Sequence, residues 1–455
     1  MKNFSLYLFI LCSLLCVSCQ TVEDAREAQK DTSLLPGERT VTPEEIGLKA
    51  GATYSLEDLE GLALSASPSV FRARQNLISE QLQLKIIKAD YLPSLDAEIG
   101  FEESTYNEMK RPQSAKMRGN GYGGIEFELL IYDFGKTDAK VAQQMQNVVA
   151  AEKELILSEI EALYKLRQAF FELKRSIELN VVAEQAVSQY KEHLDHMLAK
   201  YEHGKGTKYD CSKARVDYDA SVLEQITTSN NVRIAKANLV KALGLDKSVD
   251  FIAGEGIMPD TNLSVDELMA LLRKNDPALG VLYASAKGAS SYIDEQIANL
   301  FPTISLNAEA LASGVSSGWP AIWNLSGAAG ITQNIFNADR NMNAIEQAVA
   351  LLRSSRSQIS EYEQKAYAEL TTARLNLEKS KKRYEVALAS AKVAKENLDL
   401  VTERFNVGKA SSLERTDAQV SYTSAQADAV SAKYDWQDAL ATISYLTGGM
   451  PRNNM

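Results

Sequence analysis

Carboxylates are the side chains whose spacing in this sequence most clearly suggests a function. Two short segments alternate between apolar residues and residues that are acidic apart from one glycine, and a third segment carries one acidic residue at an alternating position. Successive residues of a β-strand point to opposite faces, so each segment would present its carboxylates on one side. Such a surface attracts cations. Its acidic residues are Asp96, Glu98, Glu102, Glu126, Glu128 and Glu309.

A second acidic group follows two glycines that lie far apart in the chain. Asp210 is six residues past Gly204, and Glu414 and Asp417 are six and nine residues past Gly408. The i, i+3 spacing of Glu414 and Asp417 places both on the same face of a helix. The alternative interpretation is an ordinary solvated face rich in charge. Two nearby basic residues would compete as ion-pair partners, namely Lys409 and Arg415.

The three histidines, His193, His196 and His203, have spacings of 3 and 7 and would share one stripe of a helix. Neutral imidazoles on one face can bind Zn²⁺, but no cysteine or carboxylate at a matching spacing completes four ligands. We therefore predict a stripe that faces solvent or a partner, with no metal and no cofactor. Cys211 is predicted to be a small buried residue with an unpaired thiol.

Enzyme signatures are absent or incomplete. Gly135-Lys136-Thr137 resembles the end of a phosphate-binding loop, but Leu130 stands where that motif requires glycine. The glycine-rich segment 119–124 matches a dinucleotide-binding pattern, yet a predicted strand follows it instead of a helix, so we predict a surface loop. Hydrolase motifs are missing as well. The sequence therefore predicts a protein that is not an enzyme.

Charge and composition exclude another group of functions. The chain has 49 basic and 60 acidic residues, and its net charge of −11 argues against nucleic-acid binding, which needs clustered Lys and Arg. Proline is absent from two long stretches, 113–258 and 321–450, and glycine is rare there. Because both residues interrupt helices, these stretches are predicted to form very long helices.

An internal duplication divides the chain into two similar halves. Ser55-Leu-Glu-Asp-Leu, followed by two prolines 25 residues apart, returns as Ser264-Val-Asp-Glu-Leu with the same pair of prolines. Each half is predicted to hold a helix with an early proline (about 56–90 and 264–299), two strands, and helices of about 68 and about 37 residues. The long helices would form antiparallel coiled-coil hairpins that reverse at glycine. The predicted segments are a signal peptide at 1–18, a linker at 19–50, a first repeat at 51–250 with its tip at 204–206, and a second repeat at 251–455 with its tip at 408.

Four strands complete the predicted architecture, at about 94–104, 121–132, 303–313 and 325–336. A length of roughly ten residues suits a strand that crosses a membrane at a tilt. Aromatic residues gather at both strand ends, as at the two interfaces of a bilayer. Four strands cannot close a barrel, and lipid requires every backbone polar group to be paired, so several chains must share one barrel.

The N-terminus is typical of an exported protein. Lys2 precedes an apolar run of about 14 residues, Phe4–Val17, which is too short to span a bilayer as a helix but suits a secretory signal. Cys19 directly follows a small residue at the end of this segment, which resembles a bacterial lipoprotein precursor. We predict that Cys19 is acylated, with a plain signal peptide cleaved nearby as the alternative. Residues 19–50 are predicted to be extended.

Four motifs indicate a known family, namely Ser55-Leu-Glu-Asp-Leu with Pro68, Ala89-Asp-Tyr-Leu-Pro93, Ile131-Tyr-Asp-Phe-Gly135 and Glu403-Arg-Phe-Asn-Val-Gly408. Through them the sequence resembles the TolC-like outer-membrane efflux protein family over about 51–450. The resemblance implies a fold that is mainly α with transmembrane β. It implies a homotrimer, in which each chain gives four strands to a twelve-stranded β-barrel and its helical hairpins to a periplasmic α-barrel.

The same resemblance implies functional roles. The protein would be an export duct of a tripartite efflux or type I secretion system, lipid-anchored in the outer membrane of a Gram-negative bacterium. The tips at Gly204 and Gly408 would contact a periplasmic adaptor (membrane fusion) protein that leads to an inner-membrane pump. Asp210, Glu414 and Asp417 would form rings at a periplasmic gate. The alternative is an envelope-spanning coiled-coil scaffold without conductance, although a scaffold needs no acidic lumen.

Overall fold

The structure is a computed structural model of the chain. It describes residues 21–23, 25–26, 47–49, 51–106, 116–204, 206–245, 251–315 and 322–449, without the side chains of 102–120, 315 and 322. The predicted signal peptide and Cys19 lie outside the described residues. Residues 21–23 and 25–26 have helical backbone, where the sequence predicted an extended linker.

Two helical hairpins dominate the fold and confirm the prediction of long antiparallel helices. Each hairpin joins a helix of 67 residues to a helix of 35 residues. At 1.5 Å per residue, the longer helices are about 100 Å long. The first hairpin consists of α4 (Lys136–Glu202) and α5 (Lys208–Ala242), and the second of α8 (Arg340–Asn406) and α9 (Ser412–Leu446).

The segment that opens each repeat is broken into two helices, where the sequence predicted one. Ser67 and Asp276, which precede prolines, have extended backbones with ψ of 120° and 116°. Proline disfavours the helical conformation of the residue before it, which explains both breaks. The four helices are α2 (Leu56–Ala66), α3 (Pro68–Ala89), α6 (Val265–Asn275) and α7 (Pro277–Ala298).

Four antiparallel strands form one sheet in the order β2-β3-β5-β6. The predicted loop at 119–124 is instead part of β3, where it pairs with β2. The last strand ends at Thr332 rather than at 336, because its partner strand begins at Thr303 and later residues have nothing to pair with. The strands are β2 (Ser94–Tyr106), β3 (Lys116–Tyr132), β5 (Thr303–Val315) and β6 (Ile322–Thr332).

The main apolar core lies where the two repeats meet, near the middle of the long helices. Phe170 and Phe171 of α4 and Leu370 of α8 are fully buried there. A short parallel pairing of β1 (Thr53–Tyr54) with β4 (Ile252–Ala253) joins the starts of the two repeats beside this core. None of the helices in the described part of the chain is long and apolar enough to cross a membrane.

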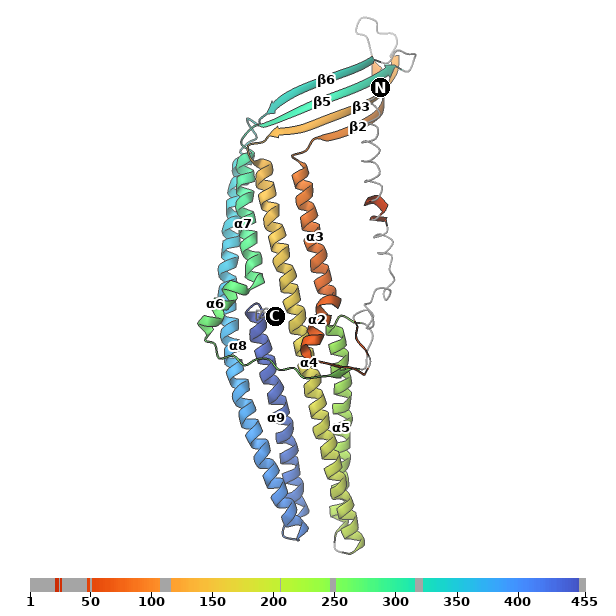
Figure 1. The fold of residues 1–455 in the computed structure, drawn as a ribbon, viewed down its shortest axis with the longest axis vertical. Helices are drawn as coiled ribbons and strands as arrows, with labels where there is room; N and C mark the ends of the chain where they lie inside the picture. Colours follow the sequence, from red (N-terminus) through yellow and green to blue (C-terminus); the bar gives the residue numbers. More distant parts are fainter. Residues whose placement is uncertain are drawn as a thin grey trace.

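The elements form a single elongated layer with two open edges. The sheet covers one end, and α3, α4, α7 and α8 run side by side away from it, with both hairpin tips at the far end (Figure 1). Towards the tips the lateral order becomes α5, α4, α9 and α8. One edge of the layer therefore carries β2, α3 and α5, and the other carries β6 and α8.

Candidate functional site

The acidic residues of the strands gather on one face of the sheet, as the alternation predicted. Asp96 pairs with Glu126, which pairs with Glu309 on the next strand, so three carboxylates stand side by side. Glu128 shares this face one pair further along, and all four side chains are exposed. Glu98 accepts a hydrogen bond of 3.0 Å from the Tyr122 hydroxyl. Among the six predicted acidic residues of the strands, Glu102 is the one whose side chain the structure does not describe.

The opposite face of the sheet is apolar and exposed. Ile99, Leu325 and Trp323 are 91%, 70% and 77% exposed. Where this sheet meets the helices, the ring of Phe134 stacks on that of Phe301, with ring centroids 5.5 Å apart. So much exposed apolar surface is costly in water, whereas hydrocarbon solvates it.

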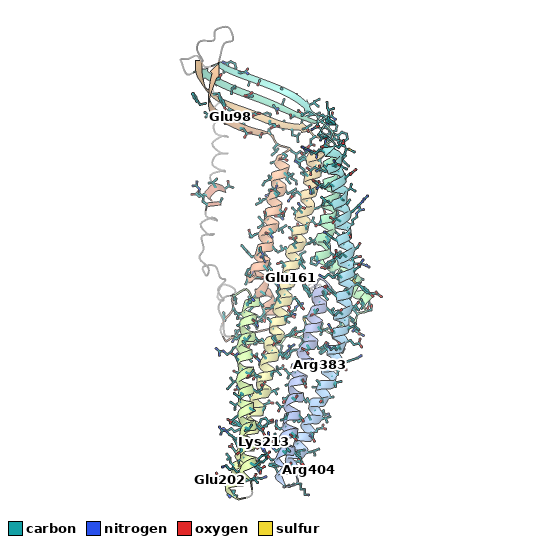
Figure 2. All side chains as sticks on the ribbon, turned by 180° about the vertical axis from the view of Figure 1, so that it is seen from behind. Glu98, Glu161, Glu202, Lys213, Arg383 and Arg404 are labelled. Atoms are coloured by element: carbon teal, nitrogen blue, oxygen red, sulfur yellow. The ribbon has the colours of Figure 1, made fainter. Side chains whose placement is uncertain are left out.

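The hairpin tips depend on glycine. Gly204 and Gly408 have φ of 69° and 79°, a left-handed conformation that glycine adopts without strain. Their amides donate to the carbonyls of Tyr201 and Phe405, which closes the last turn of each long helix. This confirms the predicted positions of the two chain reversals. Figure 2 shows Glu202 and Arg404 at the two neighbouring tips.

Asp210 lies at the first tip and has a structural partner that the sequence analysis missed. Its Oδ2 accepts hydrogen bonds from the amide and the hydroxyl of Thr207, at 3.2 and 2.6 Å, while its own amide donates to that hydroxyl at 3.1 Å. This is a capping box at the start of α5. The Thr-x-x-Asp spacing of Thr207 and Asp210 was the sequence signal for this capping box. Asp210 is therefore engaged in the helix cap rather than being a free carboxylate.

Glu414 and Asp417 occupy the first turns of α9, and both side chains are exposed. In the described chain neither forms an ion pair, so the expected competition from Lys409 and Arg415 is not observed. Arg415 is half-buried instead, where burial lowers its pKa and Glu192 opposes that shift. On α5, the hydrogen bond from Lys213 to Asp217 raises the pKa of Lys213, and the charge of Asp417 raises it further.

The histidine stripe is only partly solvated, which corrects the prediction for His193. This side chain is 2% exposed, and its Nε2 lies 3.1 Å from the Ser412 hydroxyl at the start of α9. Burial, followed by the charge of Arg415, lowers the pKa of His193 to about 4. His196 and His203 are exposed. The missed signal was spacing, because His193 follows the buried Ala186 by seven residues and so occupies a core position of the coiled coil.

A polar seam between α4 and α9 joins the two hairpins. Arg175 of α4 reaches Asp435 and Asp438 of α9, both at 3.0 Å, and Arg383 of α8 reaches Asp435 at 2.8 Å. Burial raises the pKa of Asp438 to about 6 in spite of the nearby Arg175 charge. These partners lie about 260 residues apart in the chain, so sequence spacing gave no indication of them.

The structure offers little for metal or thiol chemistry. Among the described residues, no group of three or more His, Cys, Asp and Glu is arranged to hold a metal ion. Cys211 is half-buried rather than buried, and its thiol donates to the Met197 carbonyl at 3.4 Å. It packs beside the small core of the tips, which includes Leu194 and Phe405.

Comparison with known proteins identifies the family. The family model described as "Outer membrane efflux protein" matches residues 59–245 and again 268–449, which is most of the chain. The chain belongs to the outer membrane efflux protein family. The two matched segments correspond to the two copies of the helix, strand and hairpin order described above.

Individual relatives of this outer membrane efflux protein agree with the assignment. Outer membrane protein TolC of Escherichia coli (strain K12) is 26% identical over 193 residues, which are 41% of this chain and only 39% of TolC. Outer membrane efflux protein BepC of Brucella suis biovar 1 (strain 1330) is 21% identical over 374 residues, 81% of this chain and 80% of BepC. The Campylobacter jejuni CmeC outer membrane channel superposes with a TM-score of 0.73 at 16% identity, covering 91% and 90% of the two chains.

The chain therefore has the TolC-like fold, mainly α with a four-stranded β-sheet, as predicted. Its family and its structural neighbours are channels and not enzymes.

Proposed function

We propose that this protein assembles as a homotrimer into an outer-membrane export duct, in which three four-stranded sheets form one twelve-stranded barrel. The observation that carries the proposal is the sheet itself, which has an exposed apolar face, an acidic face and two unpaired edges. A closed barrel places the apolar face in lipid and the carboxylates in an aqueous lumen. Three copies give twelve strands, which is an even number. Bacterial barrels that are formed by a single chain also have an even number of strands.

The edges of the layer support association in a ring. Within the described chain, β2 and β6 each lack a partner on their outer side, and the hydrocarbon core of a membrane does not tolerate open strand edges. Because one edge carries β2 and the other β6, each copy would pair with the next one head to tail, and such contacts close into a ring when the rotation between successive copies closes.

Exposed heptad stripes on the helices support the same contact. On α8, at one edge, Val386, Val393 and Leu400 recur every seven residues and are 62–70% exposed. On α5, at the other edge, Val216 and Leu223 are seven residues apart and 63% and 67% exposed. A heptad of apolar residues is the pattern that packs two helices together. The stripe of one copy would thus cover that of its neighbour.

The tips supply the gate and the docking surface in this proposal. Threefold symmetry would arrange Asp210, Glu414 and Asp417 as rings of carboxylates around the periplasmic opening. The two exposed carboxylates on α9 are the stronger candidates, because Asp210 is engaged in its helix cap. A periplasmic adaptor would dock on the tips at Gly204 and Gly408, and an inner-membrane pump would supply the driving force.

We also propose that Cys19 carries lipid and anchors the N-terminus in the outer membrane of a Gram-negative bacterium. The barrel already spans the bilayer, so the lipid would be an auxiliary anchor. Mass spectrometry of the mature N-terminus tests this point: an acylated Cys19 is expected, and an unmodified start elsewhere contradicts it. Cys19→Ser is expected to impair maturation more than channel structure.

Two measurements on purified protein test the duct. Crosslinking in detergent is expected to end at a band of three chains, and a stable monomer would contradict the proposal. In planar bilayers we expect cation-selective conductance, because the carboxylates of Asp96, Glu126 and Glu309 would be tripled in the lumen. Persistent absence of conductance, even in gate variants, would favour the coiled-coil scaffold instead.

A further inference from the structure

A cavity of about 700 Å³ lies near the middle of the molecule, far from the sheet and from the tips. It is bordered by α4, α8, the end of α9 and the junction of α6 with α7. Figure 2 shows Glu161, one of its lining residues, at mid-height on the helices. The volume is within the range of sites that hold small organic ligands.

Three half-buried tyrosines form aromatic walls of this cavity. The rings of Tyr164 and Tyr445 stack, with centroids 4.6 Å apart and planes 16° apart. Tyr362 borders the cavity from α8, and its hydroxyl donates to Asp276 Oδ2. The hydroxyl of Tyr164 accepts a hydrogen bond of 2.9 Å from Gln168 Nε2. Hydrogen bonding and stacking thus fix the orientation of the rings before any ligand arrives.

The charged residues that line the cavity are mainly acidic. They comprise three carboxylates, Glu161, Asp276 and Glu369, and one ammonium group, that of Lys365. Two of these carboxylates have a lysine partner at i, i+4 spacing: Lys365 lies 3.7 Å from Glu369, and Lys165, which does not line the cavity, lies 3.5 Å from Glu161. Both pairs are exposed, an arrangement of small energetic value. Burial raises the pKa of Tyr445, and the charges of Glu161 and Asp276 raise it further. The tyrosines therefore stand in a negative electrostatic potential.

The protein does not place a cation of its own on these rings. Elsewhere in the described chain, Lys or Arg side chains lie over aromatic rings, for example Lys381 over Trp436 at 5.9 Å and Lys433 over Tyr434 at 5.0 Å. None of the five such contacts involves a tyrosine of the cavity. The ring faces that border the cavity thus have no cationic partner from the described part of the protein.

We propose that this cavity binds an organic monocation, that is, a quaternary or protonated amine attached to an apolar body. Aromatic walls attract such cations through the negative faces of the rings, and they suit a weakly hydrated cation better than a metal ion. The carboxylates add long-range attraction and exclude anions. The apolar parts of the wall, such as Leu157 and Leu446, would cover the body of the ligand. This inference is independent of the proposed duct, since it concerns binding and not transport.

Titration of the purified full-length protein in detergent with ethidium, a fluorescent quaternary monocation, tests the site. We expect saturable binding that Tyr445→Leu weakens about fivefold to thirtyfold, the loss typical of one cation–π contact. Tyr445→Phe retains the ring face and should stay within about twofold of the wild type. Glu161→Gln should weaken binding, whereas Glu361→Gln, on the exposed surface of α8 outside the cavity, should not.

The two Glu→Gln variants keep the proposal testable if the leucine variant fails to fold, because both side chains are at least partly exposed. Circular dichroism establishes which variants retain the helices. Absence of saturable ethidium binding by the wild-type protein would overturn the proposal. Equal affinity of Glu161→Gln and the wild type, or of a folded Tyr445→Leu and the wild type, would overturn it as well.

Discussion

His193 provides a direct test of how the two hairpin tips are held together. Its ring is enclosed between α4 and the start of α9, where the Ser412 hydroxyl is its polar partner and Nδ1 has none among the described residues. The charged or titratable groups that face it are Arg415 on α9, Asp217 on α5, and His196 and Lys200 on α4. Arg415, His196 and Lys200 disfavour protonation of His193, as does the positive end of α9, whereas Asp217 favours protonation.

The expected effect follows from the difference between two pKa values. The pKa of His193 is about 4 in the folded protein, against 6.5 for an ordinary histidine. Between these values the unfolded chain binds more protons, so stability falls as the pH falls. At about 1.4 kcal/mol per pH unit, the loss between pH 7 and pH 4 is on the order of 3 kcal/mol per chain. His193→Gln, which does not titrate, should not show this part of the loss.

The assay combines a direct and an indirect measurement. Hydrogen–deuterium exchange at the histidine Cε1 position, followed by mass spectrometry, yields the pKa of His193 in the native protein and in urea. Denaturant midpoints are measured at pH 7 and pH 4 for the wild type and for His193→Gln. Because both proteins have the same carboxylates, the difference between their pH sensitivities gives the contribution of His193. A native pKa between 6 and 7, or equal pH sensitivity of both proteins, would refute the reasoning.

Three further predictions concern the sheet, the helix cap and the gate. Leu325→Arg, on the apolar face of the sheet, should destabilise the lipid-embedded protein by about 2–4 kcal/mol in urea titrations. Ser326→Arg, on the acidic face, is the control. Equal losses of stability in the two variants would contradict the assignment of the faces. Thr207→Ala should remove the α5 cap at a cost of about 1 kcal/mol and increase amide exchange in the first turn of α5, whereas unchanged exchange there would show that the cap contributes nothing. Replacing both Glu414 and Asp417 by Ala should reduce block by divalent or trivalent cations in single-channel recordings with the trimer intact, and unchanged block would place these residues on the outer, solvated face.

The sequence was most informative where a local pattern determines structure. Strict alternation located four strands and their acidic face, and the glycines at 204 and 408 marked both reversals, because each depends on residues close in sequence. The breaks at Ser67 and Asp276 could also have been predicted, since the residue before a proline avoids the helical conformation.

Contacts between distant segments were beyond the reach of sequence spacing. The partners of Arg175 come from the second repeat, and nothing in the local pattern indicates which acidic residues they are. His193 was assigned to a stripe facing solvent or a partner because no matching ligands completed a metal site, whereas its heptad position decided the outcome. The cavity near Tyr445 likewise combines residues from five helices of both repeats.

In the proposed homotrimer, the open edges of the single-layer fold make the concentration of the chain part of its stability. Apolar stripes and strand edges that a neighbouring copy must cover are not stabilised in an isolated chain, so folding and association become one equilibrium. Under mass action, the concentration of a homotrimer depends on the cube of the free chain concentration. A modest fall in synthesis or export would then reduce the number of assembled molecules more than proportionally, and unassembled chains would be exposed to proteolysis.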